Sequence, residues 1–532
     1  MRDRLRILPS GSESMLIELT DLDATLALLD RVIAEKPFGV TDIVPGASTV
    51  MIKFDSVLTN ASVLRALVTS LDFGSRKKRA GKVFDIPVAY GGEDLHEVAE
   101  YLGWSVDEVI RRHSGATYTV AFTGFAPGFA YMTCEDLSLD VPRRKSPRVR
   151  IPAGSVALAG RFSGVYPSDS PGGWQLIGLT TVRMWDLHRE RAALLAPGDS
   201  VRFRDVRKGP VVPVVSASSE LQVMTERKTG FVVTRADRPP LFQDLGRTGR
   251  ADQGVSESGA LDRAALRDAN AYVGNAEDAA AIEVTYGGFA FTVDRPATVA
   301  ITGAPCPLTI KSAEGSSQEA PFAKPFALDA GDELSLAIPT RGVRSYVALR
   351  GGFDLEPVLG SASFDTLAKI GPSPIVQGDI LVPARRQTSS VQLDRAVPDA
   401  LPSASDIVTL DVELGPRTDW FSASGVSSFF EQLWTVTAES SRVGIRLSAP
   451  TPLERCNHAE LPSEATSIGA IQVPHNGQPV MFLADHPLTG GYPVIAVVAK
   501  HHLNLLGQIP IGARIRFNPG SNGDSLIKDI VR

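Results

Sequence analysis

Apolar residues alternate between strand-like and helix-like spacing over the first ninety positions. Residues 21–36 and 62–71 carry apolar side chains at helical spacing, which predicts two amphipathic helices. Short apolar runs around them predict strands at residues 5–8, 15–19, 50–54 and 83–90. This alternation indicates a small α+β domain over residues 1–90.

The pattern changes in the next hundred residues. Residues 95–113 predict two short helices, and closely spaced glycines and prolines then separate short apolar runs. Such punctuation favours many short strands joined by turns, as in a β-barrel or sandwich. We therefore expect a second, β-rich domain over residues 91–208.

Two polar stretches mark boundaries in the remainder of the chain. Residues 205–224 contain prolines and show little periodicity, which places the boundary between two modules there. Residues 385–405 are polar and contain Ser and Pro, which indicates a connector. The second module is therefore expected to have two halves, residues 228–385 and 406–532.

One helix stands out in the second module, at residues 262–273. Asp262 at its start and Gly274 at its end supply the usual capping chemistry. Strand patterns dominate elsewhere, and the 47 glycines and 37 prolines agree with many turns. The predicted fold class is α+β and β-rich.

Composition excludes several functional classes. The 532 residues are enough for three or four folding units. With 54 basic and 60 acidic residues the formal net charge is −6, which is not the balance of a nucleic-acid binder. No apolar stretch approaches the roughly 18 residues of a membrane span, and the three cysteines are far apart. We expect a soluble cytoplasmic protein with no nucleic-acid or membrane partner.

Familiar catalytic strings are absent. The phosphate-binding Gly-x-x-x-x-Gly-Lys-Ser/Thr and Gly-x-Gly-x-x-Gly, the nucleophile elbow Gly-x-Ser-x-Gly and the zinc motif His-Glu-x-x-His do not occur. His501 and His502 are adjacent, so on a regular strand or helix their side chains point to different sides. No metal site is expected, and any ATP site must bind the phosphates by something other than these glycine-rich motifs.

Residues 122–178 are unusually rich in glycine, proline and aromatic side chains. The turn at 124–128 is rigid and lets a ligand approach the backbone closely. Three arginines on a proline-stiffened loop suit a carboxylate or phosphate, and turns at 152–155 and 170–174 offer N–H groups for an anion. Alternatively, these residues only shape the turns of a barrel and the arginines are solvated.

The second module has comparable clusters at residues 243–247, 256–262 and 270–275. Near the C-terminus, Asp485 closes the apolar run 482–484, where a carboxylate can act as a base or orient a nucleophile. The alternatives are a helix-capping role for Asp262 and a turn-stabilising role for Asp485.

These strings resemble a known family. GFAPGFAYM, VPRRKSPRVRIPAGSVALAG and GVYPSDSPGGWQLIG are similar to the subunit 1 signature of the allophanate hydrolase subunit 1/2 family, which includes the B component of 5-oxoprolinase and the kinase inhibitor KipI. FQDLGRTGRADQGVSESGALDRAALRDANAYVGN and GAIQVPHNGQPVMFLADHPLTGGYP resemble the subunit 2 signature, found in the C component of 5-oxoprolinase and in KipA. Both also resemble the carboxyltransferase region of urea carboxylase. The chain is identified as a fusion of the two family subunits.

The resemblance implies an architecture that agrees with the pattern. Residues 91–208 are expected to form a cyclophilin-like barrel of the carboxyltransferase C/D type, and the second module an A/B-type unit of two related halves. The chain departs from the family pattern at residues 360–364 and 465–466, which puts loop geometry and substrate identity in question.

The resemblance also implies a site between the modules. Its predicted catalytic residues are Asp485, Arg148 and Ser155. Its predicted substrate-binding residues are Gly128, Phe129, Tyr131, Arg143, Arg144, Tyr166, Ser170, Gly173, Trp174, Gln243, Asp244, Arg247, Ser258, Asp262, Asn275, Gln472, Thr489, Gly490, Gly491 and Tyr492.

Three functions follow from the family. The first is a component of an ATP-dependent 5-oxoprolinase, which uses ATP with Mg²⁺ and a separate A-type subunit to open the lactam of 5-oxoproline to glutamate. The second is a carboxyltransferase that takes its carboxyl group from carboxybiotin on a separate carrier, since the biotin-bearing Ala-Met-Lys-Met string is absent. The third is a KipI/KipA-like regulator of a histidine kinase. A small-molecule amide substrate and a possible homo-oligomer complete the expectation.

Overall fold

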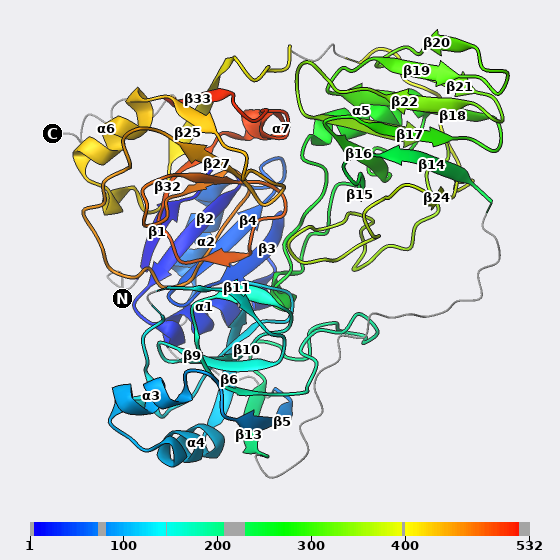
Figure 1. Ribbon diagram of the computed structural model, residues 1–532. Coiled ribbons are helices and arrows are strands. Elements are labelled where there is room, and N and C mark those ends of the chain that lie inside the picture. Colours follow the sequence, from blue (N-terminus) through cyan, green and yellow to red (C-terminus); the bar gives the residue numbers. More distant parts are fainter. Residues whose placement is uncertain (1–4, 73–80, 145, 207–228, 396–399, 521–532) are drawn as a thin grey trace.

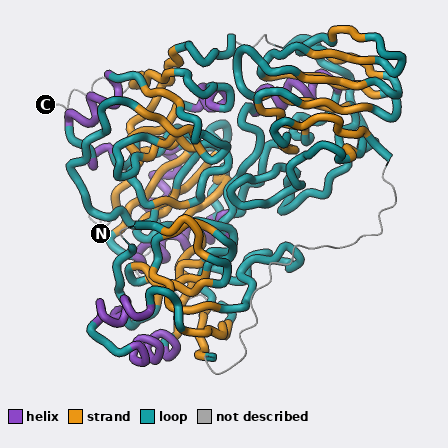
Figure 2. Tube along the Cα trace, in the orientation of Figure 1, coloured by secondary structure: helices purple, strands orange, loops and turns teal. Residues whose placement is uncertain are grey.

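A computed structural model describes residues 5–72, 81–144, 146–206, 229–395 and 400–520. Four bodies follow one another along the chain: an α+β domain, a closed barrel, a two-sheet sandwich and a second closed barrel (Figure 1). Strands and loops predominate over helices throughout (Figure 2). The predicted α+β, β-rich fold class is confirmed.

The N-terminal domain is an antiparallel sheet in the order β1-β2-β4-β3, covered by two helices. Its elements are β1 (Leu5–Pro9), β2 (Ser14–Leu19), α1 (Leu22–Glu35), β3 (Val40–Pro45), β4 (Thr49–Phe54) and α2 (Ala61–Ser70). Helix α1 begins where the Asp21 carboxylate accepts the Ala24 N–H at 2.8 Å, and its apolar face is buried on the sheet. The helices and strands predicted over residues 5–71 are all present, and β3 is an additional strand.

The first barrel closes in the order β10-β7-β6-β13-β5-β12-β9, with β5 and β13 parallel. Its strands are β5 (Val83–Tyr90), β6 (Thr117–Thr123), β7 (Ala130–Thr133), β9 (Ser155–Ala159), β10 (Phe162–Val165), β12 (Gln175–Leu179) and β13 (Ser200–Asp205). The two predicted helices are α3 (Leu95–Leu102) and α4 (Val106–Gly115), and a two-stranded arm is formed by β8 (Arg148–Ile151) and β11 (Ser170–Gly172). Because β5 pairs with barrel strands, the barrel begins at Val83 and not at residue 91.

The sandwich has sheets in the orders β20-β19-β22-β17-β14-β24 and β15-β16-β23-β18-β21. The first sheet comprises β14 (Phe231–Ala236), β17 (Phe289–Thr292), β19 (Leu308–Lys311), β20 (Ser317–Glu319), β22 (Glu333–Leu336) and β24 (Ile380–Leu381). The second comprises β15 (Leu241–Gln243), β16 (Ala281–Thr285), β18 (Ala297–Gly303), β21 (Pro325–Leu328) and β23 (Arg344–Leu349). Helix α5 (Arg263–Val273) packs against β18 and β23. Asp262 accepts the Ala265 N–H at 2.9 Å and Gly274 adopts φ 70°, so both predicted caps are present.

The second barrel closes in the order β25-β32-β29-β30-β27-β26-β33, with β25 and β33 parallel. Its strands are β25 (Ile407–Leu414), β26 (Trp434–Val436), β27 (Gly444–Ser448), β29 (Ala470–Gln472), β30 (Val480–Phe482), β32 (Val494–Val498) and β33 (Arg514–Pro519). Its arm is β28 (Glu464–Ala465) with β31 (Thr489–Gly490), and its helices are α6 (Ala423–Glu431) and α7 (Leu503–Leu506).

The two barrels share one topology. Replacing β5, β6, β7, β9, β10, β12 and β13 by β25, β26, β27, β29, β30, β32 and β33 converts one strand order into the other. Gly92 and Gly415 follow the first strand of each barrel and lie against the equivalent carbonyls of Leu176 and Val494. The two barrels are therefore the related pair, since residues 229–385 form open sheets.

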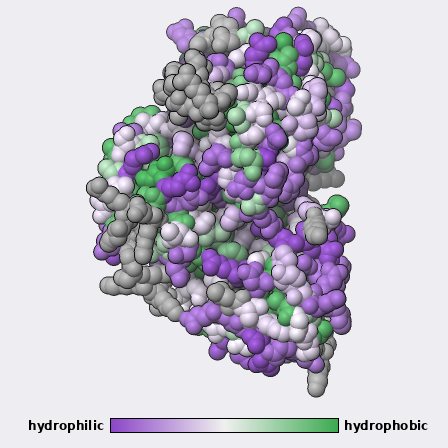
Figure 3. Space-filling view, turned by 90° about the vertical axis from the view of Figure 1, so that its left-hand side faces the viewer, coloured by the Kyte–Doolittle hydropathy of each residue, from purple (hydrophilic) through white to green (hydrophobic). Residues whose placement is uncertain are grey.

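The two predicted boundaries fall differently on the structure. Residues 207–224 lie outside the described residues, so that boundary stays a prediction. The described part of residues 385–405 contains no helix or strand, as a connector would. Figure 3 shows the left-hand face of Figure 1 as a mixture of hydrophilic and hydrophobic residues. In the described ranges no helix combines the length and apolarity needed to cross a bilayer.

Candidate functional site

The turn at residues 124–128 of the first barrel joins the two modules. Thr123 Oγ1 donates to the Ala251 carbonyl at 2.9 Å, and the Gly128 N–H donates to the Gln253 carbonyl at 2.9 Å, both in the short 3₁₀ helix η3 (Ala251–Gln253). The Phe125 N–H donates to Thr489 Oγ1 in β31 at 3.1 Å. The turn that was predicted to let a ligand approach the backbone thus forms a contact between the two modules.

The N-terminal sheet forms a second joint with the second barrel. Arg417 Nη1 lies 2.6 Å from Glu18 of β2 and also pairs with Glu464 of β28. The Ala47 N–H donates to the Ser463 carbonyl at 2.8 Å. The charges of these two glutamates outweigh the effect of burial and raise the pKa of Arg417.

A cleft of about 520 Å³ lies where the N-terminal sheet, α5 and the second barrel meet. Its charged lining residues are Glu13, Lys53, Asp55, Glu257, Arg263, Arg267 and Lys500. Clefts between domains are the usual place for small-molecule sites. None of the predicted site residues lines this cleft, although Ala484 and Glu257, which do, directly precede Asp485 and Ser258.

Lys53 is the most buried cation of the cleft, at 8% exposure. Its Nζ lies 3.3 Å from Glu257, which also pairs with Arg263 at 3.3 Å. Although burial alone would raise the pKa of Glu257, the charges of Lys53 and Arg263 lower it to about 2. Burial raises the pKa of nearby Asp42 to about 6, with Lys53 opposing the rise.

Asp485 lies behind the cleft at the centre of a buried polar network. Its carboxylate accepts Ser258 Oγ at 2.6 Å, Thr366 N and Oγ1 at 2.8 and 2.7 Å, and Arg442 Nε and Nη2 at 2.9 and 3.1 Å. Although burial opposes ionisation, Arg442 holds the pKa of Asp485 below its usual range. A carboxylate with five donors is suited to positioning and poorly suited to accepting a proton.

Arg442 extends the network to the sandwich. It donates to the Gly259 carbonyl at 2.6 Å and pairs with Glu283, which in turn accepts Tyr346 Oη at 2.8 Å. The charges of Asp485 and Glu283 outweigh burial and raise the pKa of Arg442. Arg442 is therefore a permanent cation that links the second barrel to β16.

Three further titratable groups lie beside this network. Asp365 accepts Ser256 Oγ at 3.1 Å and the N–H groups of Leu367 and Ala368, and burial together with the Asp485 charge raises its pKa to about 6. Arg247 bonds the Ser363 carbonyl, yet its Nε and Nη1 have no partner among the described residues. His486 Nε2 has none there either, and burial lowers the pKa of His486 to about 4. Arg247 and His486 therefore have nitrogen atoms available to bind polar atoms, and Asp365 has a pKa close to neutral pH.

Two of the three predicted arginines of the first module face a carboxylate of their own barrel. Arg148 forms a two-pronged pair with Asp94 at 2.7 and 2.9 Å, and Arg144 approaches the same carboxylate at 2.5 Å. Arg143 lies 4.0 Å from Glu460 of the second barrel. Asp94 is 1% exposed, so Arg144 and Arg148 serve first to neutralise a buried charge.

The second barrel carries the equivalent pair with its charges exchanged. Arg148 faces Gly172 across the first arm, and Glu464 faces Gly490 across the second. Asp94 and Arg417 donate their backbone N–H groups to the corresponding carbonyls of Leu176 and Val494. A buried ion pair therefore holds each arm to its barrel. In the first barrel the arm carries the arginine and the barrel the aspartate, whereas in the second the arm carries the glutamate and the barrel the arginine.

The predicted aromatic residues form a closed cluster. Phe129, Tyr131, Tyr166 and Trp174 are each at most 5% exposed and make edge-to-face contacts with one another. Burial raises the pKa of Tyr166. Ser155 Oγ donates to the Pro152 carbonyl at 2.8 Å, and Ser170 Oγ has no partner among the described residues. The aromatic residues stabilise the barrel, and their assignment to substrate binding stays a prediction.

The remaining predicted residues lie in three places. Gln472, Gly490 and Tyr492 meet in the second barrel, where Gln472 Nε2 donates to the Tyr492 carbonyl at 2.9 Å. Gly173 and Gly491 lie beside Arg144 and Arg143. Asp244 and Asn275 line a smaller cavity of about 230 Å³ in the sandwich.

The inner walls of that smaller cavity are hydrogen-bonded. Asp244 accepts Ser361 Oγ and Ser363 Oγ, both at 2.6 Å. Gln243 donates to the Phe364 carbonyl at 2.9 Å, while its Oε1 has no described partner. The loop that departs from the family pattern therefore supplies the hydroxyls that fix Asp244.

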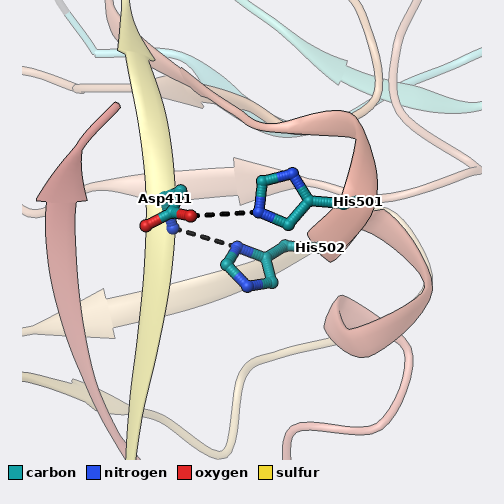
Figure 4. Close-up of side chains that lie close together, drawn as sticks. All are labelled: Asp411, His501 and His502. Carbon is teal, nitrogen blue, oxygen red and sulfur yellow. Dashed lines mark hydrogen bonds and ion pairs between the residues drawn. The ribbon is translucent and has the colours of Figure 1, made fainter. Parts of the chain in front are cut away.

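His501 and His502 lie in the 3₁₀ helix η5 (Lys500–His502), with ring centroids 4.2 Å apart. The expectation that the two rings diverge is wrong, because the tight turn swings both toward Asp411 (Figure 4). His501 Nε2 lies 3.0 Å from the Asp411 carboxylate, and His502 Nδ1 accepts the Asp411 N–H at 3.0 Å. That acceptor role places the proton of neutral His502 on Nε2, which is unfavourable for metal ligation.

Sequence reasoning missed several charged residues of the cleft and of the network behind it. Lys53 and Arg263 of the cleft and Arg442 and Asp365 of the network were not predicted, because they come from three different bodies of the chain. A buried Lys on the apolar strand 49–54 was the one available signal, since lysine is rarely buried without a partner.

The paired barrels, their arms and the cleft between modules define a two-module carboxyltransferase-type protein. The chain belongs to the carboxyltransferase-domain family: residues 5–195 match the family model "Carboxyltransferase domain, subdomain C and D", and residues 253–519 match "subdomain A and B".

Individual relatives agree with this assignment. The C-type subunit of 5-oxoprolinase from Escherichia coli K12 is 35% identical over 289 residues, which are 54% of this chain and 89% of that protein. The B-type subunit of 5-oxoprolinase from Escherichia coli O157:H7 is 47% identical over 131 residues, 24% of this chain and 60% of that protein. Urea amidolyase of Saccharomyces cerevisiae is 34% identical over 310 residues, 55% of this chain and 17% of that protein. The crystal structure of TTHA0988 is 33% identical, with a TM-score of 0.81 over 95% of this chain and all of that one.

Proposed function

We propose that this chain combines the B and C components of an ATP-dependent 5-oxoprolinase and acts with a separate A-type subunit. One observation carries the proposal: a single chain matches both components, B before C, in modules that meet at a shared cleft. In this proposal the enzyme opens the lactam of 5-oxoproline to glutamate.

The cleft offers suitable groups for such a substrate. Lys53 and Arg263 carry positive charge into it and suit the carboxylate of 5-oxoproline. Asp365, with a pKa of about 6, lies in the network behind it and is poised to exchange a proton near neutral pH. We propose Asp485 as a positioning residue that holds Arg442 and Ser258, while Arg148 and Ser155 fix the arm of the first barrel.

In this proposal ATP binds outside the cleft. Glu13, Asp55 and Glu257 place three carboxylates among the four cations of the cleft, and their charge repels a triphosphate. An unstrained lactam is a poor electrophile, so phosphorylation of its carbonyl oxygen has to precede attack by water. We assign that step, with Mg²⁺, to the A-type subunit, and the binding and orientation of the lactam to this chain.

The test is glutamate and ADP release by the purified chain with and without an A-type subunit. Glutamate is expected when the chain, the A-type subunit, ATP and 5-oxoproline are all present. Replacing Lys53 by Met is expected to raise the KM for 5-oxoproline at least tenfold. K311M, which removes an exposed lysine on β19, is the matched control and should leave KM unchanged. Equal rates with and without this chain, or an unaltered KM in K53M, would contradict the proposal.

Carboxyl transfer is the second candidate, because urea amidolyase matches 55% of this chain. A carrier domain would have to bring carboxybiotin, and the chain would hold the acceptor amide in the same cleft. Binding of a biotinylated carrier domain and carboxylation of urea, without glutamate formation, would favour this function over the first.

A further inference from the structure

A second groove lies in the sandwich, at the ends of several of its strands. It measures about 440 Å³ and is bordered by the ends of β14, β18, β21 and β23. Four arginines line it, namely Arg295, Arg350, Arg385 and Arg386, whereas Asp329 is the one acidic residue among its described lining residues. Positive charge is thus concentrated at this groove, although the net charge of the chain is −6.

Most of this charge is uncompensated. In the described part of the chain, the guanidinium groups of Arg385 and Arg386 make no hydrogen bond or ion pair. Arg350 Nη1 donates to the Val273 carbonyl at 2.7 Å, and its Nη2 donates to the Ser389 carbonyl at 3.3 Å, which leaves its charge without a carboxylate. Arg295 alone is paired, with Asp294 at 2.7 Å.

Guanidinium groups bind phosphate oxygens in a two-pronged manner and are weakly hydrated, so they give up water readily for this contact. One carboxylate is satisfied by one arginine. Three unneutralised arginines around a groove of this volume match a ligand with several adjacent negative charges. We propose that the groove binds an oligophosphate group, such as that carried by a nucleoside triphosphate.

The groove and the cleft differ in charge. The cleft mixes three carboxylates with its cations, whereas the groove has Asp329 alone against four arginines. Helix α5 connects the two places, since Arg263 lines the cleft in its first turn and Arg350 holds the Val273 carbonyl at its other end. The proposal concerns binding at the groove and does not depend on the reaction at the cleft.

Calorimetric titration of the full chain with sodium tripolyphosphate tests the proposal. We expect saturable binding that weakens as salt rises, because charge dominates it. The double variant R385A/R386A should bind at least tenfold more weakly. R514A/R516A removes two exposed arginines from β33 of the second barrel and is the matched control, expected within twofold of the wild type. Wild-type affinity in R385A/R386A, or no binding at 1 mM tripolyphosphate, would overturn the proposal.

Further titrants identify the source of the phosphate groups. Equal affinity for ATP and tripolyphosphate means that the phosphates alone are recognised, and tighter binding of ATP adds a contact to the nucleoside. In either case the proposal requires that R385A/R386A bind the titrant more weakly than the wild type does. Inorganic phosphate or AMP binding as tightly as tripolyphosphate would show a single-anion site, and binding of an oligoglutamate peptide in place of tripolyphosphate would show a protein-docking site. Either result would overturn the proposal.

Discussion

At Asp485, donors from three loops converge on one carboxylate. Ser258, Thr366 and Arg442 belong to different parts of the sandwich and the second barrel, so the charge of Asp485 fixes their relative positions. Replacing Asp485 by Asn leaves Arg442 without one of its two carboxylates and turns an amide N–H toward other donors. Breaking a buried ion pair costs roughly 3–5 kcal/mol.

We therefore expect D485N to lower the midpoint of urea unfolding clearly, together with any activity. The matched control is D419N, since Asp419 is 56% exposed and pairs weakly with Arg6 at 3.6 Å. That variant should unfold like the wild type. A D485N protein of unchanged stability but no turnover would instead support a direct catalytic role.

Asp365 makes the protein sensitive to pH in a defined direction. Its pKa in the folded chain is about 6, above the ordinary value of 3.8, so its contribution to stability is complete below pH 3.8 and is lost as pH rises through 6. Between pH 5 and 7.5 the wild type should lose about 1 kcal/mol relative to D365N, in which this titration is absent. Urea unfolding of both proteins across this range measures the difference, and parallel curves would contradict the shifted pKa.

Individual residues were predictable where the chemistry is local. Asp262 was expected as a cap and is one, because capping depends on the next three residues. Arg442 was not predicted, because its role depends on Asp485 and Glu283, which are 43 and 159 residues away in sequence. Glycine-rich strings marked the loops correctly but did not distinguish loops that join modules from loops that bind a ligand.

At the scale of elements, the turn at 124–128 and β31 fit together with no spare room. A Cβ on Gly124 would lie 2.6 Å from Thr489 Oγ1 and 2.9 Å from Thr489 Cγ2. Replacing Gly124 by Ala should therefore push β31 away and lose the bond from the Phe125 N–H to Thr489. Overpacking of this kind typically costs about 1–3 kcal/mol.

The chain offers a matched control in Gly115, at the end of α4. A Cβ there meets no atom within 4 Å, so G115A should be neutral or slightly stabilising. Thermal unfolding of both variants measures the difference. A G124A protein as stable as G115A would show that the joint between the modules is loose.

Elements with their own start and stop signals were predicted, whereas pairing was not. Helices α1 and α5 followed from spacing and caps. Strand β5 was assigned to the first domain because its pattern alone does not show that it pairs with β13, more than a hundred residues later. The repeat of the barrel was not predicted from the sequence for the same reason. The two barrels share their strand order, while most of their side chains differ.

At the scale of the molecule, the two modules are held by non-covalent contacts at several separate places. An apolar cluster shares Leu16, Val44 and Met51 of the first module with Ala251 and Leu488 of the second, and ion pairs surround it. The order of the modules was predictable from the two family signatures. Their contact surface was not, since the strings that carried the resemblance begin after residue 120, whereas the N-terminal sheet over residues 5–54 borders both the cleft and the second barrel.

Because these contacts do not depend on the covalent connection, the modules should assemble as separate chains. Residues 1–206 and 229–532, produced together, are expected to elute as a one-to-one complex in size-exclusion chromatography. E18K in the first piece should weaken the complex, because Glu18 lies 2.6 Å from Arg417 of the second. E100K, an exposed change on α3, is the control. Separate elution of the unaltered pieces would mean that the cleft between modules requires the connection, and that relatives with separate subunits need a further partner to form it.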